Sequence, residues 1–350
     1  MRSLLRILLS LLLLIVVLGL LAATLGPFLI SPNAAPGIAD AGSVAAPDSR
    51  FINIGAAGEI PLEIHYLTQP GPAASEAPTG SSETETAIPP FVLLHGFTFN
   101  AFTWTQILGP LASDAPVLAY DQIPYGLSAK PVSPDTTGVD LYSKSAALER
   151  LFRVLDALDI QRAILVGNSS GGTLALEAAL AQPERIAGLV LIAPWVHSKR
   201  PILPSWLVAL PQVERLTLAL ARYLGTGSPL LAYSYADPSK IDESRRALTG
   251  AHRLMAGWDL AWGALLQRSL TDPVEIAEHL DEINQPALVL TGDNDQVVPP
   301  ADTEATATAL PNASFAVLQG CGHLPQEECP QQVTSAIAAW LDAQEGALAP

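Results

Sequence analysis

The sequence predicts an α/β protein built on a mostly parallel sheet, and two observations lead to that fold class. Short apolar runs rich in Val, Ile and Leu recur at residues 91–94, 117–120, 163–166, 189–193, 287–290 and 315–318. Continuous apolar runs of this length are typical of strands buried on both faces. Stretches with helical spacing lie between or after these runs, at residues 143–158, 173–181 and 331–342. Strands that alternate with helices favour a parallel sheet with helices on both faces.

The first thirty residues predict a membrane-spanning helix. Arg2 and Arg6 precede an uncharged run that extends from residue 7 to residue 30. About 20 apolar helical residues are enough to cross the hydrocarbon core of a bilayer. A cleaved signal peptide is the competing interpretation, although its apolar region typically has about 7–15 residues. In both cases the basic residues stay on the cytoplasmic side, so we expect a membrane-anchored extracytoplasmic domain, or a secreted one after cleavage.

Composition separates this chain from disordered and nucleic-acid-binding proteins. Hydrophobic residues make up 49% of the 350 positions and charged residues 15%, which is enough apolar material for a large core. The formal net charge is −16. An acidic surface repels nucleic acid and anionic headgroups, so we expect no nucleic-acid partner and interpret the charge as keeping the domain soluble.

Three segments between the N-terminal helix and the regular pattern are expected to be strands or irregular structure. Residues 31–50 are rich in Pro, Ala, Gly and Ser without periodicity, and predict a flexible linker. Residues 51–54 and 62–66 alternate in polarity around Gly-containing turns and predict an opening hairpin. Residues 69–90 carry no large apolar side chain before Ile88 and predict a surface insertion.

Residues 197–284 interrupt the alternation of strands and helices. This stretch has helical segments but no convincing strand pattern, and its aromatic residues are Trp206, Tyr223, Tyr233, Tyr235, Trp258 and Trp262. We interpret it as a helical cap inserted between two strands, which divides the core into residues 51–196 and 285–345. We expect most of these aromatic side chains to fill the cap's own small core.

The motif Gly-Asn-Ser-Ser-Gly-Gly at residues 167–172 predicts a nucleophile. It follows the apolar run 163–166 and precedes the helical stretch 173–181. A serine at a sharp turn between a strand and a helix stands exposed above the sheet, near a helix N-terminus that favours negative charge. Ser169 has the required glycines two residues before and after it, whereas Ser170 is preceded at that distance by Asn168. Ser169 is therefore the expected nucleophile.

A serine nucleophile needs a base to accept its proton, and His323 has the best position among the six histidines. It follows the last predicted strand and precedes the last predicted helix. His65 lies within a strand pattern, and His95 precedes a tight turn that it is expected to hold. Surface or packing roles are expected for the remaining three, His197, His252 and His279.

The base in turn needs a carboxylate, and two aspartates compete for that role. Asp293 and Asp295 both follow the apolar run 287–290, and spacing alone does not separate them. The oxyanion of the reaction needs backbone N–H donors. We expect these from Ser170, which follows the nucleophile, and from Phe97, in the loop after the first core strand.

With these motifs in this order, the sequence resembles the α/β-hydrolase superfamily over roughly residues 51–345. The matching segments are residues 95–97, 121–128, 167–171, 292–295 and 322–323. The resemblance implies an eight-stranded, mostly parallel sheet. It also implies Asp295, three residues after Gly292, as the acid, with Asp293 as the other option. Pro124 stands where glycine is commoner in the family, a departure that affects loop shape more than chemistry.

The triad Ser169, Asp295 and His323 predicts a serine hydrolase without metal or cofactor, and a carboxylic ester is the first expected substrate. The aromatic, Leu-rich cap favours an apolar small molecule. An amide, peptide or carbon–carbon bond is the alternative, since the elbow also resembles that of hydrolases acting on ring-cleavage products. Enzymes with an aspartate nucleophile are disfavoured because residue 169 is serine. A non-catalytic binding protein on the same fold is the hypothesis from another class.

The two cysteines, Cys321 and Cys329, leave a further question open. They are close enough in sequence to pair in an oxidising compartment if their Cβ atoms face each other. Two partly buried free thiols are the alternative.

Overall fold

The computed structural model describes residues 2–38, 40–57, 60–72, 88–132, 140–197, 201–226, 228–344 and 348. Most of the surface insertion that we expect at 69–90 lies outside these residues. The exceptions are Gln69, which ends a strand, and residues 70–72 and 88–90.

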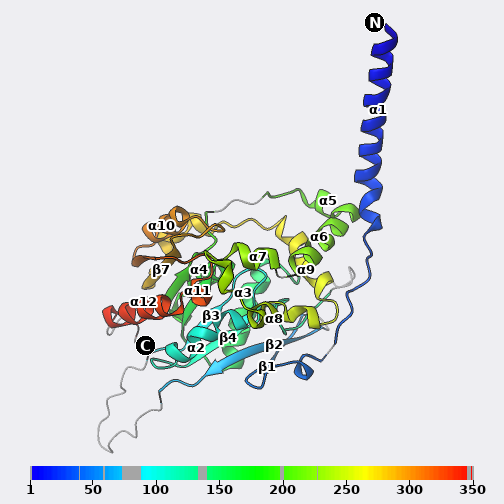
Figure 1. The fold of residues 1–350 in the computed structure, drawn as a ribbon. Coiled ribbons are helices and arrows are strands. Elements are labelled where there is room, and N and C mark those ends of the chain that lie inside the picture. The colour runs from blue at the N-terminus through cyan, green and yellow to red at the C-terminus, as the bar shows by residue number, and fades with distance from the viewer. Residues whose placement is uncertain are drawn as a thin grey trace, which may run out of the picture.

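An eight-stranded sheet forms the centre of the molecule (Figure 1). The strands are β1 (Arg50–Ala57), β2 (Ile60–Gln69), β3 (Phe91–Leu94), β4 (Val117–Tyr120), β5 (Ala163–Asn168), β6 (Ile186–Ile192), β7 (Ala287–Gly292) and β8 (Ala313–Leu318). Their order across the sheet is β1-β2-β4-β3-β5-β6-β7-β8. Only the pairs β1–β2 and β2–β4 are antiparallel, and all later pairs are parallel. The predicted fold class is confirmed, including the opening hairpin.

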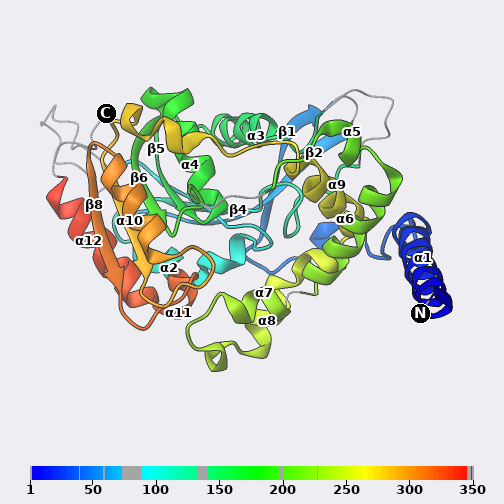
Figure 2. The ribbon, with the colours of Figure 1, turned by 90° about the horizontal axis from the view of Figure 1, so that it is seen from above.

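Helices cover both faces of the sheet, as alternation of strands and helices predicts. Their bounds are α2 (Thr105–Leu111), α3 (Lys144–Ala157), α4 (Ser170–Ala181), α10 (Pro300–Ala309), α11 (Pro325–Glu328) and α12 (Pro330–Ala343). Successive residues of β3 point to opposite sides: Val92 and Leu94 pack with α3, α4 and α10, whereas Phe91 and Leu93 pack with α2 and α12. Figure 2 shows α4 and α12 on opposite sides of the sheet.

The segment between β6 and β7 forms the helical cap. Its helices are α5 (Ser205–Val208), α6 (Pro211–Leu224), α7 (Ser228–Tyr233), α8 (Glu243–Thr249) and α9 (Trp258–Ser269), and its described residues contain no strand. Trp262 joins the cap to the core by donating its indole N–H to the carbonyl of Pro124 (3.2 Å). Half of the six aromatic residues are buried as expected: Tyr235, Trp258 and Trp262. The other half are exposed: Trp206, Tyr223 and Tyr233.

The N-terminal helix α1 (Arg2–Leu25) stands away from the body (Figure 1), and the short turn η1 (Gly26–Leu29) ends it. By length and composition, residues 6–29 could span a membrane, and none of the most apolar window is buried.

Residues 31–50 differ from the flexible linker that their composition predicts. Ile38 pairs with Met255 of the cap, the amide of Ala35 donates to Asp259 Oδ1 (2.9 Å), and Ala41 is buried in the core. These contacts use mainly backbone groups and small side chains. Such contacts leave no periodic apolar pattern, which explains why composition gave the wrong expectation.

Candidate active site

Ser169 occupies the sharp turn between β5 and α4. Its backbone dihedral angles are φ 55° and ψ −120°, a strained conformation for a residue with a side chain. The neighbouring glycines allow the turn to pack. A Cβ atom at Gly167 would lie 2.5 Å from the carbonyl oxygen of Gly171, and one at Gly171 would lie 2.0 Å from that of Leu94. Only glycine fits at either position, so the motif is required by the geometry of the turn.

His323 is held by a carboxylate on one side and by the cap on the other. Its Nδ1 lies 2.8 Å from Asp295 Oδ2, and its backbone N–H donates to the carbonyl of Ser234 (2.7 Å). The side chains of His323 and Asp295 are both buried. With Nδ1 engaged by a carboxylate, Nε2 is the nitrogen free to exchange a proton with a substrate or nucleophile.

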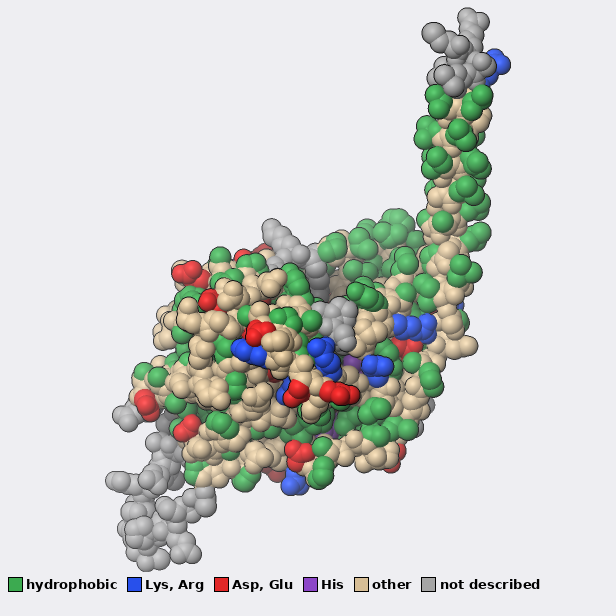
Figure 3. Space-filling model, viewed as in Figure 1, with side chains coloured by type: hydrophobic (Ala, Val, Ile, Leu, Met, Phe, Trp, Pro, Cys, Tyr) green, Lys and Arg blue, Asp and Glu red, His purple; other side chains and the backbone are tan. Residues whose placement is uncertain are grey.

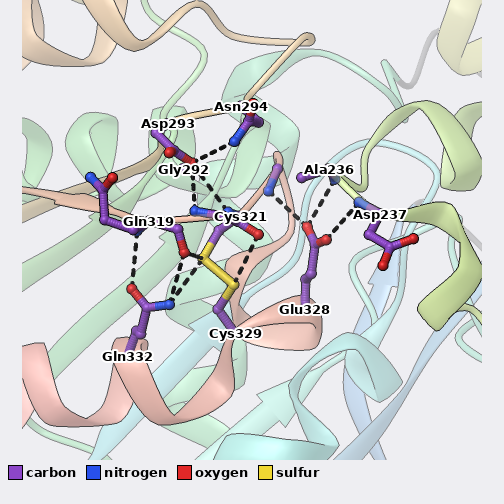
Figure 4. The surroundings of a disulfide bond; sticks show 12 residues. Ala236, Asp237, Gly292, Asp293, Asn294, Gln319, Cys321, Glu328, Cys329 and Gln332 are labelled. Carbon is purple, nitrogen blue, oxygen red and sulfur yellow. Dashed lines mark hydrogen bonds between the residues drawn. A yellow bond between two sulfur atoms is a disulfide. The ribbon is translucent and has the colours of Figure 1, made fainter.

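The two competing aspartates have different partners. Asp295 Oδ1 accepts the backbone N–H groups of Val297 (2.8 Å) and Val298 (2.9 Å), which directs Oδ2 to His323. Asp293 Oδ1 instead accepts the N–H groups of Gly320 (2.8 Å) and Cys321 (3.3 Å). Asp293 therefore braces the loop that carries the histidine (Figure 4). Asp295 contacts the imidazole itself.

Two further features hold the histidine loop: a disulfide bond, which the sequence left open, and a buried carboxylate, which it did not indicate. Cys321 and Cys329 form a disulfide bond (Figure 4). The bond closes a short loop of the chain that contains His323. Beside it, the buried carboxylate of Glu328 accepts three backbone N–H groups, from Gly322 (2.7 Å), Ala236 (2.9 Å) and Asp237 (2.8 Å). Glu328 thus ties the cap to the residue before His323. No motif signals this role, because the donors are backbone amides.

The expected oxyanion donors, Phe97 and Ser170, line the same cavity as Ser169. Ser170 is the first residue of α4, so its N–H has no acceptor within the helix. Phe97 belongs to the loop after β3, and the neighbouring Gly96 packs so closely that a Cβ atom there would lie 3.1 Å from Ser169 Cβ. The loop is fixed by His95.

His95 holds that loop from beneath rather than facing a substrate. Its Nδ1 donates to the carbonyl of Gly96 (2.8 Å) and its Nε2 accepts the N–H of Gln122 (3.0 Å). Burial lowers the pKa of His95, which keeps the ring neutral as this pairing requires.

A cavity of about 650 Å³ opens over these groups and is shared by the core and the cap. Ser169, Ser170, Phe97 and His323 lie in its wall. Most of its remaining wall is apolar and includes Leu174, Leu224, Leu230, Leu265 and Leu266. Charged groups line another part: Lys144, Glu177 and Asp272, with Lys144 Nζ 3.4 Å from a Glu177 carboxylate oxygen. The cavity suits a largely apolar ligand.

A hydrogen-bonded series of Ser49, His65 and Asp121 lies elsewhere in the core. His65 Nδ1 is 2.7 Å from Asp121 Oδ2 and His65 Nε2 is 2.8 Å from Ser49 Oγ. Burial raises the pKa of Asp121, but the imidazoles of His65 and His95 and the backbone N–H of Ala101 outweigh that effect and bring it to about 2. None of the three residues lines the cavity. We therefore infer that these three hydrogen-bonded residues stabilise the fold and take no part in the reaction.

The described residues contain no cluster of three or more His, Cys, Asp or Glu side chains arranged to hold a metal ion.

This chain is similar in sequence to a known protein family and to a curated relative. The family model described as "Alpha/beta hydrolase family" matches residues 91–336. The proline iminopeptidase of Lactobacillus delbrueckii subsp. bulgaricus is 27% identical over 272 residues, which cover 73% of this chain and 90% of that protein.

Two solved structures share the architecture. A thermophilic esterase from Thermogutta terrifontis superposes with a TM-score of 0.61 at 23% identity, covering 84% of this chain and 98% of that one. A membrane phospholipase A described as a bacterial virulence factor superposes with a TM-score of 0.61 at 22% identity, covering 97% of this chain and 99% of that one. At these identities the likeness extends to the fold alone.

Proposed function

The chain belongs to the alpha/beta hydrolase family, and on this premise we propose that it is a serine hydrolase that cleaves carboxylic esters. The observation that carries the proposal is the buried hydrogen bond between His323 and Asp295, at the wall of the cavity that Ser169 also lines. A nucleophile, a base and an orienting carboxylate are the parts that acyl transfer needs.

In the proposed reaction, Ser169 Oγ attacks the acyl carbon while His323 Nε2 accepts the hydroxyl proton. Asp295 stabilises the imidazolium that forms. The N–H groups of Phe97 and Ser170 donate to the oxyanion of the tetrahedral intermediate. The intermediate collapses as His323 returns the proton to the leaving alcohol. Water then attacks the acyl-enzyme with His323 again as base, releasing the acid and restoring Ser169.

The largely apolar wall of the cavity supports an ester with an apolar acyl or alcohol group. An amide or peptide bond is the second candidate, because a relative over 73% of this chain is named a proline iminopeptidase. The same triad also serves for a carbon–carbon bond. These bonds differ in the leaving group that His323 must protonate, so a substrate panel separates them.

We further place the catalytic domain on the extracytoplasmic side of a membrane, with α1 as its anchor. The disulfide between Cys321 and Cys329 supports export, since disulfides persist in oxidising compartments. Secretion after cleavage is the alternative. Intact mass of the mature protein and membrane fractionation, with and without residues 1–30, decide between them. A full-length chain that stays soluble would contradict the anchor.

A fluorophosphonate probe tests the nucleophile. We expect labelling of the wild type and its loss in Ser169→Ala. Ser49→Ala is the matched control, because Ser49 also bonds a histidine that bonds an aspartate but does not line the cavity. Equal labelling of Ser169→Ala would overturn the assignment, and an unlabelled wild type would favour a non-catalytic binding protein. Esters of several chain lengths, with amide and carbon–carbon substrates alongside, then identify the bond.

A further inference from the structure

An apolar face on the outside of the cap has no partner in the described part of the chain. It comprises Ile202, Trp206, Leu210, Leu216, Leu220 and Tyr223, and is called the docking face below. Trp206 is 70% exposed and Tyr223 59% exposed. Leu216, Leu220 and Tyr223 recur at helical spacing along one side of α6, opposite Leu218 and Ala221, which are buried.

The docking face lies beside the base of α1. Figure 1 shows α5 and α6 at the end of the body from which α1 rises, and Figure 3 shows hydrophobic side chains gathered there. Hydrogen bonds fix this arrangement. Gln212 Nε2 donates to the carbonyl of Thr24 (3.3 Å), and Arg215 Nη1 donates to that of Ile30 (3.1 Å). The start of α6 therefore lies against η1 and the last turn of the apolar helix.

These contacts set the depth of the cap relative to the candidate membrane span. The span ends at Leu29, so Thr24 lies five residues inside it. At the rise of a helix this is about 8 Å below the end of the span. Interfacial helices bury their apolar faces about 5–10 Å into the boundary between headgroups and acyl chains. If α1 spans the bilayer, the start of α6 lies near that depth, with α5 directly before it in the chain.

The arginine side chains of α6 are bound by neighbouring groups of the protein, which is consistent with a position of α6 at the lipid surface. Arg222 turns its guanidinium to the carbonyls of Ser31 (2.9 Å) and Asn33 (2.8 Å), and to Asp259. The guanidinium of Arg215 is likewise bound to the chain that follows η1. Between Leu216 and Tyr223, Arg222 is the one charged residue of α6. Its guanidinium is bound to the carbonyls of Ser31 and Asn33 and to Asp259.

We propose that the docking face inserts into the lipid surface and that the cap admits ester substrates from the bilayer. The proposal rests on the proposed function, in which α1 is an anchor and Ser169 a nucleophile. Leu224, the last residue of α6, lines the cavity with Ser169, so one helix joins the lipid-facing surface to the catalytic chamber. An apolar chain entering along α6 stays out of bulk water. The substrate class is therefore a water-insoluble ester held in a membrane.

Depth-dependent fluorescence quenching tests the insertion. The full-length protein is reconstituted in zwitterionic phosphatidylcholine vesicles, with or without bromine on the acyl chains. Trp206 is the exposed one of six tryptophans. We expect brominated lipid to lower the emission of the wild type but not that of Trp206→Phe. Insertion through apolar contacts also predicts that high salt leaves the quenching unchanged. Protein that floats with vesicles but shows no quenching of Trp206 would overturn the docking and leave the anchor intact.

A comparison of two substrates tests the route to the cavity. The variant Trp206→Asp/Leu216→Asp/Leu220→Asp is expected to lose about 10-fold or more activity on a long-chain ester in vesicles, because burial of three large side chains is lost. Its activity on a soluble short-chain ester stays unchanged. Val317→Asp is the matched control, since Val317 is also exposed but lies on β8, at the far edge of the sheet. Equal losses on both substrates overturn the route.

These experiments distinguish a failure of the membrane docking from a failure of the proposed hydrolase activity. Fluorophosphonate labelling of the triple variant shows whether its active site is intact. If the wild type neither reacts with the probe nor hydrolyses the soluble ester, the proposed function fails while Trp206 quenching can still report docking. Cross-linking of Leu216→Cys into a dimer, without quenching, would assign the face to a second copy of the chain and overturn the proposal.

Discussion

Asp295 Oδ2 lies 2.8 Å from Nδ1 of His323, on a carboxylate whose other oxygen is fixed by two backbone N–H groups. The geometry leaves this aspartate one orientation and the imidazole one tautomer. Asp293, two residues earlier, has no such contact with the ring and binds the loop backbone instead. Two residues that spacing alone leaves equivalent are thus separated by their partners, and their variants should behave differently.

Asp295→Asn is expected to lower kcat by about 10³–10⁴-fold, because the amide no longer fixes the tautomer or stabilises the imidazolium. Asp293→Asn should reduce kcat by less than about 10-fold, since only loop contacts change. Steady-state hydrolysis of a soluble ester measures both, with circular dichroism to check folding. An Asp293→Asn variant as impaired as Asp295→Asn would show that the loop contacts, and not the carboxylate at the ring, govern catalysis.

Glu328→Gln should lower both thermal stability and kcat. One carboxylate oxygen that accepts backbone N–H groups becomes an NH₂ group that faces donors, at a cost of about 1–3 kcal/mol. Because Gly322 directly precedes His323, we expect kcat to fall more than KM changes. Thermal unfolding and ester kinetics measure the two effects. Glu304→Gln, at an exposed position on α10, is the control and should leave both unchanged. A Glu328→Gln variant with wild-type kcat would separate the cap contact from the position of the base.

Replacing both Cys321 and Cys329 by serine should destabilise the protein by about 2–3 kcal/mol, as expected for the loss of a cross-link closing a short loop. The same loop carries His323, so activity should be lost at a lower temperature than in the wild type. Residual activity after heating, in the presence and absence of a reductant, measures this. Reductant should have no effect on the double variant. Equal heat resistance of both proteins would show that the hydrogen bonds of the loop suffice without the cross-link.

The sequence predicted the sheet and much of the candidate site because both depend on local patterns. Buried parallel strands appear as continuous apolar runs, and a serine in a strand–turn–helix elbow requires glycines at fixed offsets. The close approach of Gly171 to Leu94 is the physical reason for one of them. The place of His323 after the last strand is a local pattern of the same kind, and it predicts the base.

The remaining features depend on contacts between distant segments. The amides that bind Glu328 include residues 236 and 237, about ninety positions earlier, and Ile38 meets Met255 across an even longer separation. Backbone amides carry no sequence signature, so neither contact could be predicted. Spacing alone leaves Asp293 and Asp295 open for a similar reason, since the N–H groups that each carboxylate meets are set in the folded turn; only the family resemblance favours Asp295.

Acid stability should depend on Asp121. Its pKa is about 2 in the folded protein, against an ordinary value of 3.8. The folded state therefore binds this proton less readily than the unfolded state, so the contribution is present above about pH 4 and is lost as pH falls towards 2. We expect the free energy of unfolding of the wild type to fall by about 2 kcal/mol more than that of Asp121→Asn over this interval. Chemical denaturation in detergent at several pH values measures the slopes. Parallel slopes would show that other carboxyl groups account for acid sensitivity.

Narrowing the cavity should shift the preferred length of the substrate. Leu265 lies on α9, lines the cavity and packs towards the core. Leu265→Trp adds bulk to the apolar wall and leaves Ser169, Asp295 and His323 themselves unchanged. We therefore expect kcat/KM for long acyl esters to fall by about 10-fold or more, as for other losses of apolar contact in a pocket, while acetyl esters are affected little. Leu254→Trp is the control, because Leu254 belongs to the cap but is exposed and does not line the cavity. A series of p-nitrophenyl esters measures the profile. A uniform loss across all chain lengths would place the acyl group elsewhere in the cavity and would direct attention to the charged wall formed by Lys144 and Glu177.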